Sequence, residues 1–274
     1  MRKSIYIIIA LILAACTPEL PESPETLVIE GWIENDGAPV VFVTSSVSTS
    51  FQEQELTDLI GHVATTANVA ITYDGVRYPL TGTISDDYFL RFYYTSKTLK
   101  GVVGGTYKLE VDWKGMHAEA ETTILAPGTV DSIAVERHPM IDTSYIVKAH
   151  INPAADVRYY RFLSMAVGKD PTYAISYNGI FDSKLHSDDM FAVNRGRQDP
   201  IEYSDYYYTY GDSVRFKLAS IDAAAYDFWT LYDENAMFSH AALLPYSSNL
   251  KGNIDGGLGY WFGYGVAAYT VVIR

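Results

Sequence analysis

The sequence has only one cysteine, Cys16, among its 274 residues. A single cysteine cannot form a disulfide within the chain, and it leaves no thiol elsewhere for a covalent nucleophile or a cysteine-ligated metal. Basic residues are also few, with 20 Lys and Arg against 33 Asp and Glu and a formal net charge of −13. Binding to nucleic acid depends on cations that neutralise phosphates, so we expect no nucleic-acid partner.

The apolar run at the N-terminus, Ile5 to Ala15, is shorter than the roughly 20 residues that a membrane-spanning helix requires. It follows the cations Arg2 and Lys3 and ends in small residues, which is typical of a secretory signal peptide. We therefore predict that residues 1–15 are a signal peptide.

The end of this run, Leu13-Ala14-Ala15-Cys16, matches a bacterial lipobox, in which the chain is cut before the cysteine and its thiol is lipidated. We predict lipidation at Cys16; the alternative is an ordinary signal peptide that contains a cysteine. Acyl chains of palmitate length add about 0.8 kcal/mol per buried CH₂ and hold a protein stably on a membrane. Residues 16–26 are rich in proline and glutamate and predict an extended, lipidated acidic tether.

Alternation of apolar and polar residues predicts strands in the first half of the chain. The expected strands cover residues 27–34, 40–43, 62–73, 76–78, 88–93, 106–113 and 116–124. Asp74-Gly75 and Lys114-Gly115 are turn signals between them. Short strands separated by turns over about 100 residues predict an Ig-like β-sandwich domain over residues 27–125.

The second half, residues 126–274, begins at Ala126-Pro127-Gly128, the expected domain boundary. We expect a β-rich domain with long Tyr-rich loops and short strands over 173–212 and one short helix over 222–234. Asp222 is the expected N-cap of this helix. Further strands are expected over 145–151, 159–167, 214–219 and 267–273. The predicted fold class is therefore all-β in the main.

Patterns that would indicate catalysis or metal binding are weak. The segment His186-Ser187-Asp188-Asp189 has the residue types of a metal site, but a solvated loop is the favoured interpretation. Asp86-Asp87, Asp182 and Asp188-Asp189 leave a glycosidase pair open, because the separation of the carboxyl groups decides it. No Gly-x-Ser-x-Gly elbow occurs. We predict no catalytic residue, no metal and no cofactor.

Two segments are candidates for ligand contact, although no ligand-binding residue is assigned. Asn249 to Gly263 is glycine-rich but lacks the context of a phosphate or dinucleotide loop. The favoured interpretation is a turn with glycines at positive φ before an aromatic strand, and a ligand-contacting loop is the alternative. Tyr203 to Tyr210 favours an edge strand, with a stacking platform for sugar or peptide as the alternative.

Six short pieces of the chain, taken together and in order, have a familiar pattern. They are Leu27–Ile33, Gly105–Val111, Val130–Ile133, Tyr210–Val214, Ser220–Asp222 leading to Tyr226, and Asn253–Tyr260. This pattern resembles an uncharacterised Bacteroidetes lipoprotein family, domain of unknown function 4249. The resemblance implies that a TonB-dependent outer-membrane receptor is often encoded nearby, and that no activity or catalytic residue is established for the family.

We therefore expect a lipid-anchored outer-membrane protein, on the periplasmic or the cell-surface side, that binds a ligand and is not an enzyme. Its expected partners are the membrane, through the lipid at Cys16, and a TonB-dependent receptor. A structural surface protein of fimbrial type is the alternative, since such proteins are also lipidated β-sandwiches. A glycan-acting hydrolase is the third hypothesis.

Overall fold

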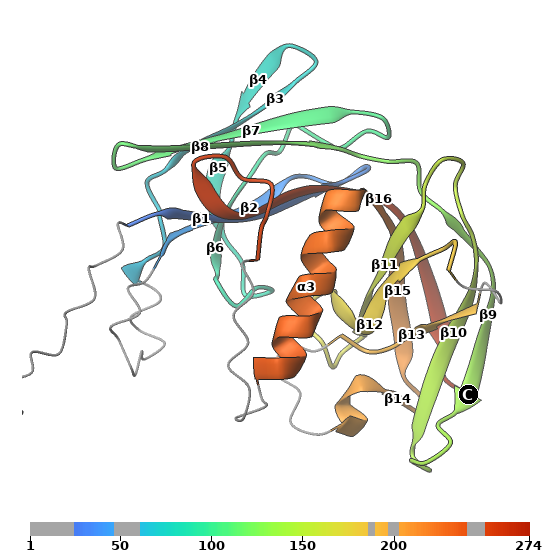
Figure 1. The fold of residues 1–274 in the computed structure, drawn as a ribbon. Helices are drawn as coiled ribbons and strands as arrows, with labels where there is room; N and C mark the ends of the chain where they lie inside the picture. The colour runs from blue at the N-terminus through green and yellow to red at the C-terminus, as the bar shows by residue number, and fades with distance from the viewer. Residues whose placement is uncertain (1–24, 47–60, 186–189, 197–202, 240–249) are drawn as a thin grey trace, which may run out of the picture.

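The computed structural model describes residues 25–46, 61–185, 190–196, 203–239 and 250–274. These residues form three β-sheets, the helix α3 (Ala223–Ser239) and the short 3-10 helix η1 (Tyr203–Tyr206) (Figure 1). The prediction of a mainly β protein is confirmed. No helix in these ranges combines the length and the apolarity needed to cross a membrane. The predicted signal peptide and Cys16 lie outside the described residues.

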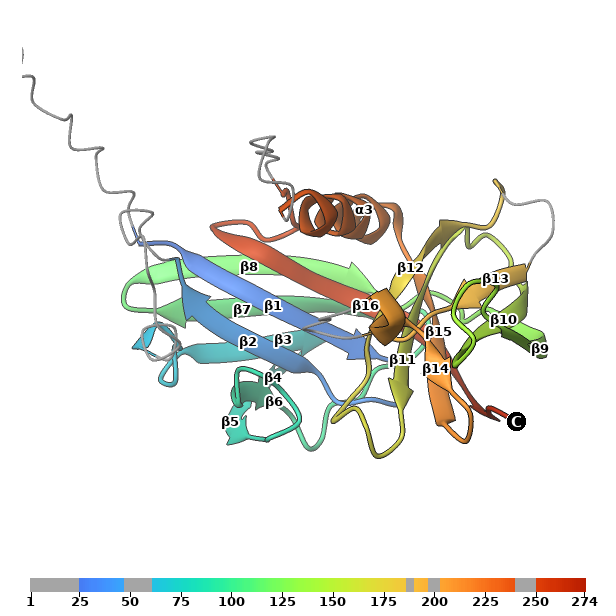
Figure 2. The same ribbon diagram turned by 90° about the horizontal axis from the view of Figure 1, so that it is seen from below.

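The largest sheet has eight strands and contains both the first and the last strand of the chain. In order across the sheet they are β12 (Ala174–Asp182), β11 (Tyr159–Ala166), β15 (Ser213–Ile221), β16 (Gly257–Val272), β1 (Leu27–Glu34), β2 (Val40–Ser45), β6 (Phe92–Thr95) and β5 (Thr81–Ile84). Figure 2 shows β16 lying along β1 before it continues toward β15.

Two smaller sheets of four strands each complete the fold. The first has the order β4 (Val76–Pro79), β3 (Asn68–Tyr73), β7 (Thr106–Trp113) and β8 (Met116–Thr123). In the second, β10 (Ser144–Asn152) pairs with each of the other three strands, β9 (Thr129–Arg137), β13 (Met190–Val193) and β14 (Tyr208–Thr209).

Strand β16 joins the two halves of the chain. Its first part pairs with β1 in parallel, with Gly257 opposite Leu27. Its second part pairs with β15 in antiparallel fashion, with Val272 opposite Ser213. Residues 27–125 and 126–274 therefore share one continuous sheet.

Side chains alternate along β16 and so define the two faces of the large sheet. On one face, Trp261 is buried in the core that includes β3, β7 and β8, while Tyr269 packs into the core that includes β10. On the opposite face, Phe262 and Tyr264 pack with residues of α3. Both small sheets thus pack on one face of the large sheet, and α3 packs on the other face (Figure 1).

The hairpins of the first small sheet turn where the sequence predicts. Asp74 and Gly75 have φ values of 49° and 71° between β3 and β4, and Lys114 and Gly115 have 49° and 80° between β7 and β8. Two consecutive residues at positive φ form the primed turn whose twist matches a pair of antiparallel strands.

Several segments differ from the predicted strands. The strand expected over 88–93 begins only at Phe92, and residues 85–91 form a loop. The segment expected as long loops with short strands contains the nine-residue strand β12, and β9 was not predicted. Strand β16 begins at Gly257, well before residue 267. Its glycines belong to the strand because they let backbones approach: a Cβ on Gly259 would lie 1.9 Å from the carbonyl oxygen of Ile29.

Candidate functional site

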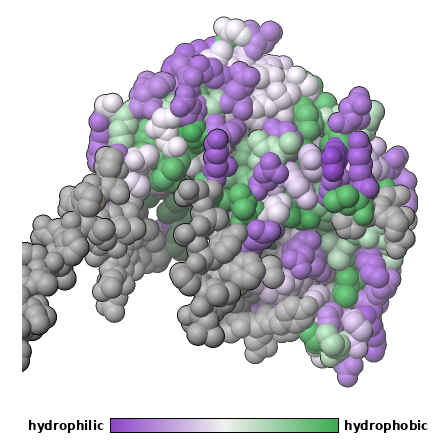
Figure 3. All heavy atoms as spheres, viewed as in Figure 1, coloured by the Kyte–Doolittle hydropathy of each residue, from purple (hydrophilic) through white to green (hydrophobic). Residues whose placement is uncertain are grey.

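A cavity of about 1400 Å³ lies on the face of the eight-stranded sheet that carries α3. It is lined by residues of β1, β2, β11, β12, β15, β16 and α3, and by the loop between β5 and β6. Figure 3, seen from the same side as Figure 1, shows a hollow with hydrophobic surface at its base. Residues from both halves of the chain therefore form one site.

One wall is formed by the rings of Trp32, Phe42 and Tyr88, which cluster with the ring of Tyr93. Tyr88 makes edge contacts with the other three, at centroid distances of 6.0, 5.3 and 5.2 Å respectively. Trp32 and Phe42 lie on the cavity side of the paired strands β1 and β2. Burial is the main cause that raises the pKa of the Tyr88 hydroxyl to about 12, so this group is a neutral phenol at physiological pH.

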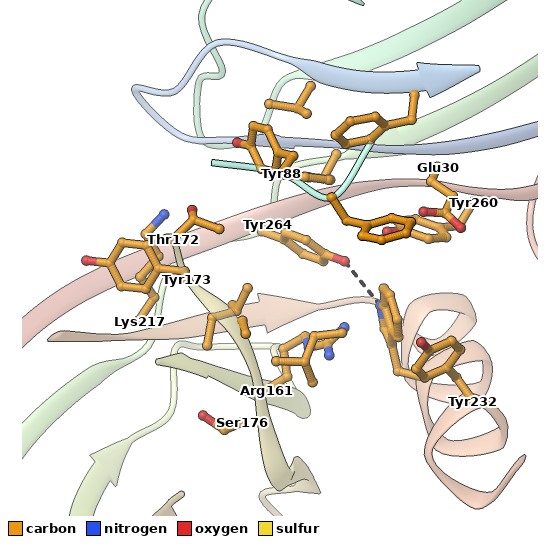
Figure 4. Close-up of a pocket in the computed structure, with 18 of the residues that line it drawn as sticks. Glu30, Tyr88, Arg161, Thr172, Tyr173, Ser176, Lys217, Tyr232, Tyr260 and Tyr264 are labelled. Atoms are coloured by element: carbon orange, nitrogen blue, oxygen red, sulfur yellow. Dashed lines mark hydrogen bonds between the residues drawn. The ribbon is translucent and has the colours of Figure 1, made fainter. Parts of the chain in front are cut away.

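Helix α3 forms another wall. It follows Asp222, whose Oδ1 accepts a hydrogen bond of 2.8 Å from the backbone N–H of Ala225 and so caps the helix as predicted. Trp229 is 4 % exposed and lies against Phe262 of the sheet. Its Nε1 donates a hydrogen bond of 3.1 Å to the hydroxyl of Tyr264 (Figure 4). These contacts fix the helix on the sheet at the side of the cavity.

A buried cation borders the cavity. Arg161 of β11 is 1 % exposed, and its Cζ lies 4.0 Å from the ring centroid of Trp229. Its Nε and Nη2 are buried without a hydrogen-bond partner, and so is Oγ of Ser176 on β12, which also lines the cavity. Among the described residues, the hydroxyl of Tyr208 is the other buried side-chain atom of this kind.

A second cation of the cavity, Lys217 on β15, is neutralised in place. Its Nζ lies 2.6 Å from Oε2 of Glu34 on β1 and 4.4 Å from the ring centroid of Tyr173. No carboxylate of the described residues pairs with Arg161 in this way. Of the Arg and Lys residues that line the cavity, Arg161 is therefore the one whose charge has no counterion in the described part of the chain.

Two carboxyl groups that line the cavity have raised pKa values. Glu30 keeps contact with water through the cavity, but the surrounding protein disfavours its charged form and raises its pKa. Burial also raises the pKa of Asp233 on α3, and the charge of Arg161 opposes this shift without overcoming it. A close ion pair would lower the pKa of Asp233, so the raised value agrees with the unpaired geometry of Arg161.

The catalytic and metal candidates from the sequence do not meet in this cavity. Asp182 is buried and lies 2.5 Å from Nη2 of Arg158, while Asp86 pairs with Arg91 on an exposed loop. Neither aspartate lines the cavity. Residues 186–189 lie outside the described residues. Within the described ranges, no group of three or more His, Cys, Asp or Glu is placed to hold a metal ion.

The glycine-rich segment is mainly structural in its described part. Asn253 holds it against β16, because its side chain accepts a hydrogen bond from the backbone N–H of Trp261 at 2.8 Å and donates one to the carbonyl oxygen at 2.7 Å. Gly256 and Gly259 have φ values of 78° and 99°, as the favoured interpretation expects. Tyr260 is the residue of this segment that reaches the cavity.

The Tyr-rich run contributes one ring to the cavity. Tyr206 lines it and stacks on Tyr177 with a centroid distance of 4.0 Å. Tyr208 belongs to the two-residue strand β14 and is fully buried, whereas Tyr210 is 72 % exposed. The run thus contains both a short strand and a ring that borders the cavity.

The sequence does not point to most residues of the cavity. The patterns of β1 and β2, however, indicate that both faces of these strands are covered. Trp32 lies on the same face of β1 as Glu30 and Glu34, and two glutamates would lead us to expect that this face is exposed to water. Phe42 lies on the face opposite to Val41. Strands that are apolar on both faces indicate that both faces are covered. This pattern points to the site, but not to Arg161.

Comparison with protein families identifies the chain. The family model described as Domain of unknown function (DUF4249) matches residues 15–270. The chain therefore belongs to this family, as the resemblance of its sequence indicated. The match includes every residue of the cavity. No curated protein matches the chain.

Proposed function

We propose that this DUF4249 protein is a lipid-anchored binding protein of the outer membrane that captures a small molecule in the cavity beside α3 and works with a TonB-dependent transporter. The observation that carries the proposal is the cavity, with its aromatic walls and unpartnered polar atoms. Ligand sites are concave and mostly apolar, with a few polar groups that orient the ligand. The volume of about 1400 Å³ exceeds the roughly 300–1,000 Å³ of common ligand pockets. The cavity therefore has room for a ligand as large as those that common pockets hold.

The anchor and the partner rest on the sequence. The lipobox ending at Cys16 supports attachment to the membrane. The tether over residues 16–26 extends at most about 3.3–3.6 Å per residue, which is enough for the folded part to reach a neighbouring barrel. The resemblance to proteins encoded beside TonB-dependent receptors supports the choice of partner.

Binding in the cavity is tested with N-phenyl-1-naphthylamine, a neutral dye that fluoresces in apolar surroundings. Thr44 and Thr172 line the cavity, and Figure 4 shows Thr172 beside Tyr173. The double variant Thr44→Trp/Thr172→Trp fills part of this space. Its matched control, Val76→Trp/Tyr210→Trp, places the same side chains at exposed positions that do not line the cavity.

We expect saturable binding of the dye to the parent protein and to the control variant. The cavity variant should bind roughly tenfold more weakly, a change of about 1.4 kcal/mol. Equal binding by all three proteins would show that the dye binds outside the cavity. No binding by the parent protein would show that the cavity does not bind the dye. Either result contradicts the proposal.

The transporter is tested by gentle solubilisation of the outer membrane and capture of the protein through a C-terminal tag. We expect a TonB-dependent transporter in the captured material from cells that make the parent protein, and much less from cells that make Cys16→Ala, which lacks the anchor. Recovery of the protein alone in both cases contradicts this part of the proposal.

Glycan hydrolysis is the second candidate, and one observation favours it. Glu30 and Asp233 are two carboxyl groups with raised pKa values in one aromatic-lined cavity, and glycosidases use such pairs. Incubation with a mixture of bacterial surface glycans, followed by mass spectrometry, tests it. Cleavage that disappears in both Glu30→Gln and Asp233→Asn would favour the enzyme over the binding protein.

A further inference from the structure

We propose that the edge of Arg161 formed by Nε and Nη2 binds an oxyanion of the ligand, a carboxylate or a phosphate ester, while the ligand's aromatic or apolar body lies against the rings of the cavity. This inference rests on the proposed function, because it names the chemical class of the molecule that the cavity captures.

The two unpartnered nitrogens of Arg161 form one edge of its guanidinium group. The N–H bonds of Nε and Nη2 are parallel, and a carboxylate or phosphate accepts both in a bidentate contact. Trp229 covers one face of the group. Nε and Nη2 have no hydrogen-bond partner among the described residues. The bidentate edge is therefore left for a ligand.

Ser176 supplies a third buried donor at the same cavity. It lies on β12, which pairs with β11, the strand that carries Arg161. Its side chain is fully buried, lines the cavity and has no hydrogen-bond partner (Figure 4). A hydroxyl donates readily to an oxyanion. Two adjacent strands thus present buried donors that the fold itself leaves unused.

The charges around the cavity also select an anion. Lys217 is paired with Glu34, whereas the charge of Arg161 has no counterion among the described residues. Burial raises the pKa values of Glu30 and Asp233, so the surrounding protein disfavours the charged forms of both carboxyl groups. Aromatic rings beside carboxyl groups would suit a cationic ligand, but an unpaired buried guanidinium repels one.

The ligand body is expected to be aromatic or apolar because of the side chains that face Arg161 across the cavity. Trp32, Phe42 and Tyr88 contact one another on β1, β2 and the 85–91 loop. Phe89, in the same loop, lines the cavity and is 61 % exposed, although it is a large apolar side chain. These rings stack favourably on a flat ligand.

The test compares two dyes that share one ring system. 1-Anilinonaphthalene-8-sulfonate carries an oxyanion, and N-phenyl-1-naphthylamine is its neutral counterpart. Each is titrated into the parent protein, Arg161→Met, Arg161→Lys and the double variant Glu136→Gln/Lys148→Met. The double variant removes an ion pair, with Nζ of Lys148 2.7 Å from Oε2 of Glu136, that does not line the cavity, so the net charge of the protein is unchanged. Circular dichroism and the neutral dye report whether each variant keeps its fold and its cavity.

We expect Arg161→Met to bind the anionic dye roughly tenfold more weakly, as one lost charge-assisted contact implies, and to bind the neutral dye as the parent does. Arg161→Lys keeps the charge but loses the bidentate edge, so it should recover only part of the affinity. The double variant should bind both dyes as the parent does. Displacement of the anionic dye by 2-naphthoate or by 2-naphthyl phosphate, and not by 2-naphthol, identifies which oxyanion fits better.

Two failures have different meanings. If the neutral dye binds in the cavity but Arg161→Met binds the anionic dye like the parent, the oxyanion site is wrong and the binding protein stands. The oxyanion site is also wrong if 2-naphthol displaces the anionic dye as well as the two anions do. If neither dye binds in the cavity at all, the proposed function itself fails.

Discussion

The indole Nε1 of Trp261 donates a hydrogen bond to the backbone oxygen of Tyr107, 3.0 Å away. Trp261 belongs to the last strand, β16, and Tyr107 to β7 in the first half of the chain, and both side chains are fully buried. Gly31, opposite Trp261 on β1, makes room for the ring, because a Cβ there would lie 2.9 Å from Cε3 of the indole. The end of the chain thus completes the core of its first half.

Trp261→Ala should therefore weaken the fold strongly. Truncation of a large buried aromatic side chain lowers the free energy of unfolding by roughly 3–5 kcal/mol, and here a buried hydrogen bond is lost as well. Urea denaturation followed by circular dichroism measures the change. Trp113→Ala is the control, because Trp113 only borders the same core and its Nε1 lies 3.4 Å from Oγ1 of Thr66 at an exposed site. Equal losses for the two variants would contradict the role given to Trp261.

Helix α3 allows a matched comparison of two of its own residues. Trp229 is 4 % exposed and Tyr232 is 45 % exposed. Trp229→Ala should lower the free energy of unfolding by roughly 3–5 kcal/mol, as for other core aromatics, and Tyr232→Ala by about 1 kcal/mol at most. Thermal and urea melts of both variants test this. If Trp229→Ala melts like the parent, the helix does not pack on the sheet as described.

Arg161→Met tests whether the buried cation serves binding or stability. Unpartnered buried polar groups cost about 1–3 kcal/mol, and the contact with Trp229 offsets up to about 2 kcal/mol. Methionine has no polar atom to leave unpaired, so we expect the free energy of unfolding to stay the same or to rise by about 1 kcal/mol. Arg158→Met is the control: it removes the ion-pair partner of the buried Asp182 and should lower the same quantity. A large loss of stability in Arg161→Met would show that Arg161 holds the fold together.

Local patterns in the sequence were enough to predict elements that have clear alternation, a turn dipeptide or an N-cap residue. The alternation of Thr106–Trp113 and the turn at Lys114-Gly115 became the β7–β8 hairpin. Asp222 marks the start of α3, but the helix continues to Ser239 instead of ending at residue 234. Residues 235–239 contain no glycine or proline, so no helix-breaking residue ends α3 at residue 234.

The cavity could not be predicted in the same way, because it depends on contacts between distant parts of the chain. Arg161 alternates with the buried residues Tyr160 and Phe162 on β11, so the sequence indicates only that it lies on the other face. The pairing of β11 with β15 and the position of Trp229 on α3 turn that face into a buried one. The parallel pairing of β16 with β1 joins opposite ends of the chain, and no local pattern specifies it.

The predicted anchor at Cys16 has a direct test. Cys16→Ala removes the acceptor of the lipid, so we expect the chain to remain uncut or to appear in the soluble fraction. Labelling with a palmitate analogue and fractionation of the cell envelope measure both outcomes. Thr17→Ala changes the next residue and should be lipidated and anchored like the parent. A Cys16→Ala protein that stays on the membrane after a salt wash would show that something other than the lipid holds it.

The affinity for an anionic ligand should rise as the pH falls. Glu30 and Asp233 line the cavity with raised pKa values, and their negative charges oppose an oxyanion at Arg161. Protonation of the two carboxyl groups as the pH falls removes those charges, while the sulfonate of 1-anilinonaphthalene-8-sulfonate stays ionised. Stability follows the same sign: because the folded-state pKa values exceed the unfolded ones, both groups stabilise the fold below their unfolded pKa values, and this contribution is lost as the pH rises through the folded values.

Titration of the anionic dye at successively lower pH should show roughly a three- to tenfold gain in affinity for the parent protein, the size expected once one or two charges across a cavity are lost. The variant Glu30→Gln/Asp233→Asn carries neither charge, so it should show little gain over the same range. His62 also lines the cavity and hydrogen-bonds Ser45 at 3.0 Å, so His62→Gln is the control for a contribution from its ring. If His62→Gln abolishes the gain while Glu30→Gln/Asp233→Asn keeps it, the two carboxyl groups do not control the pH dependence.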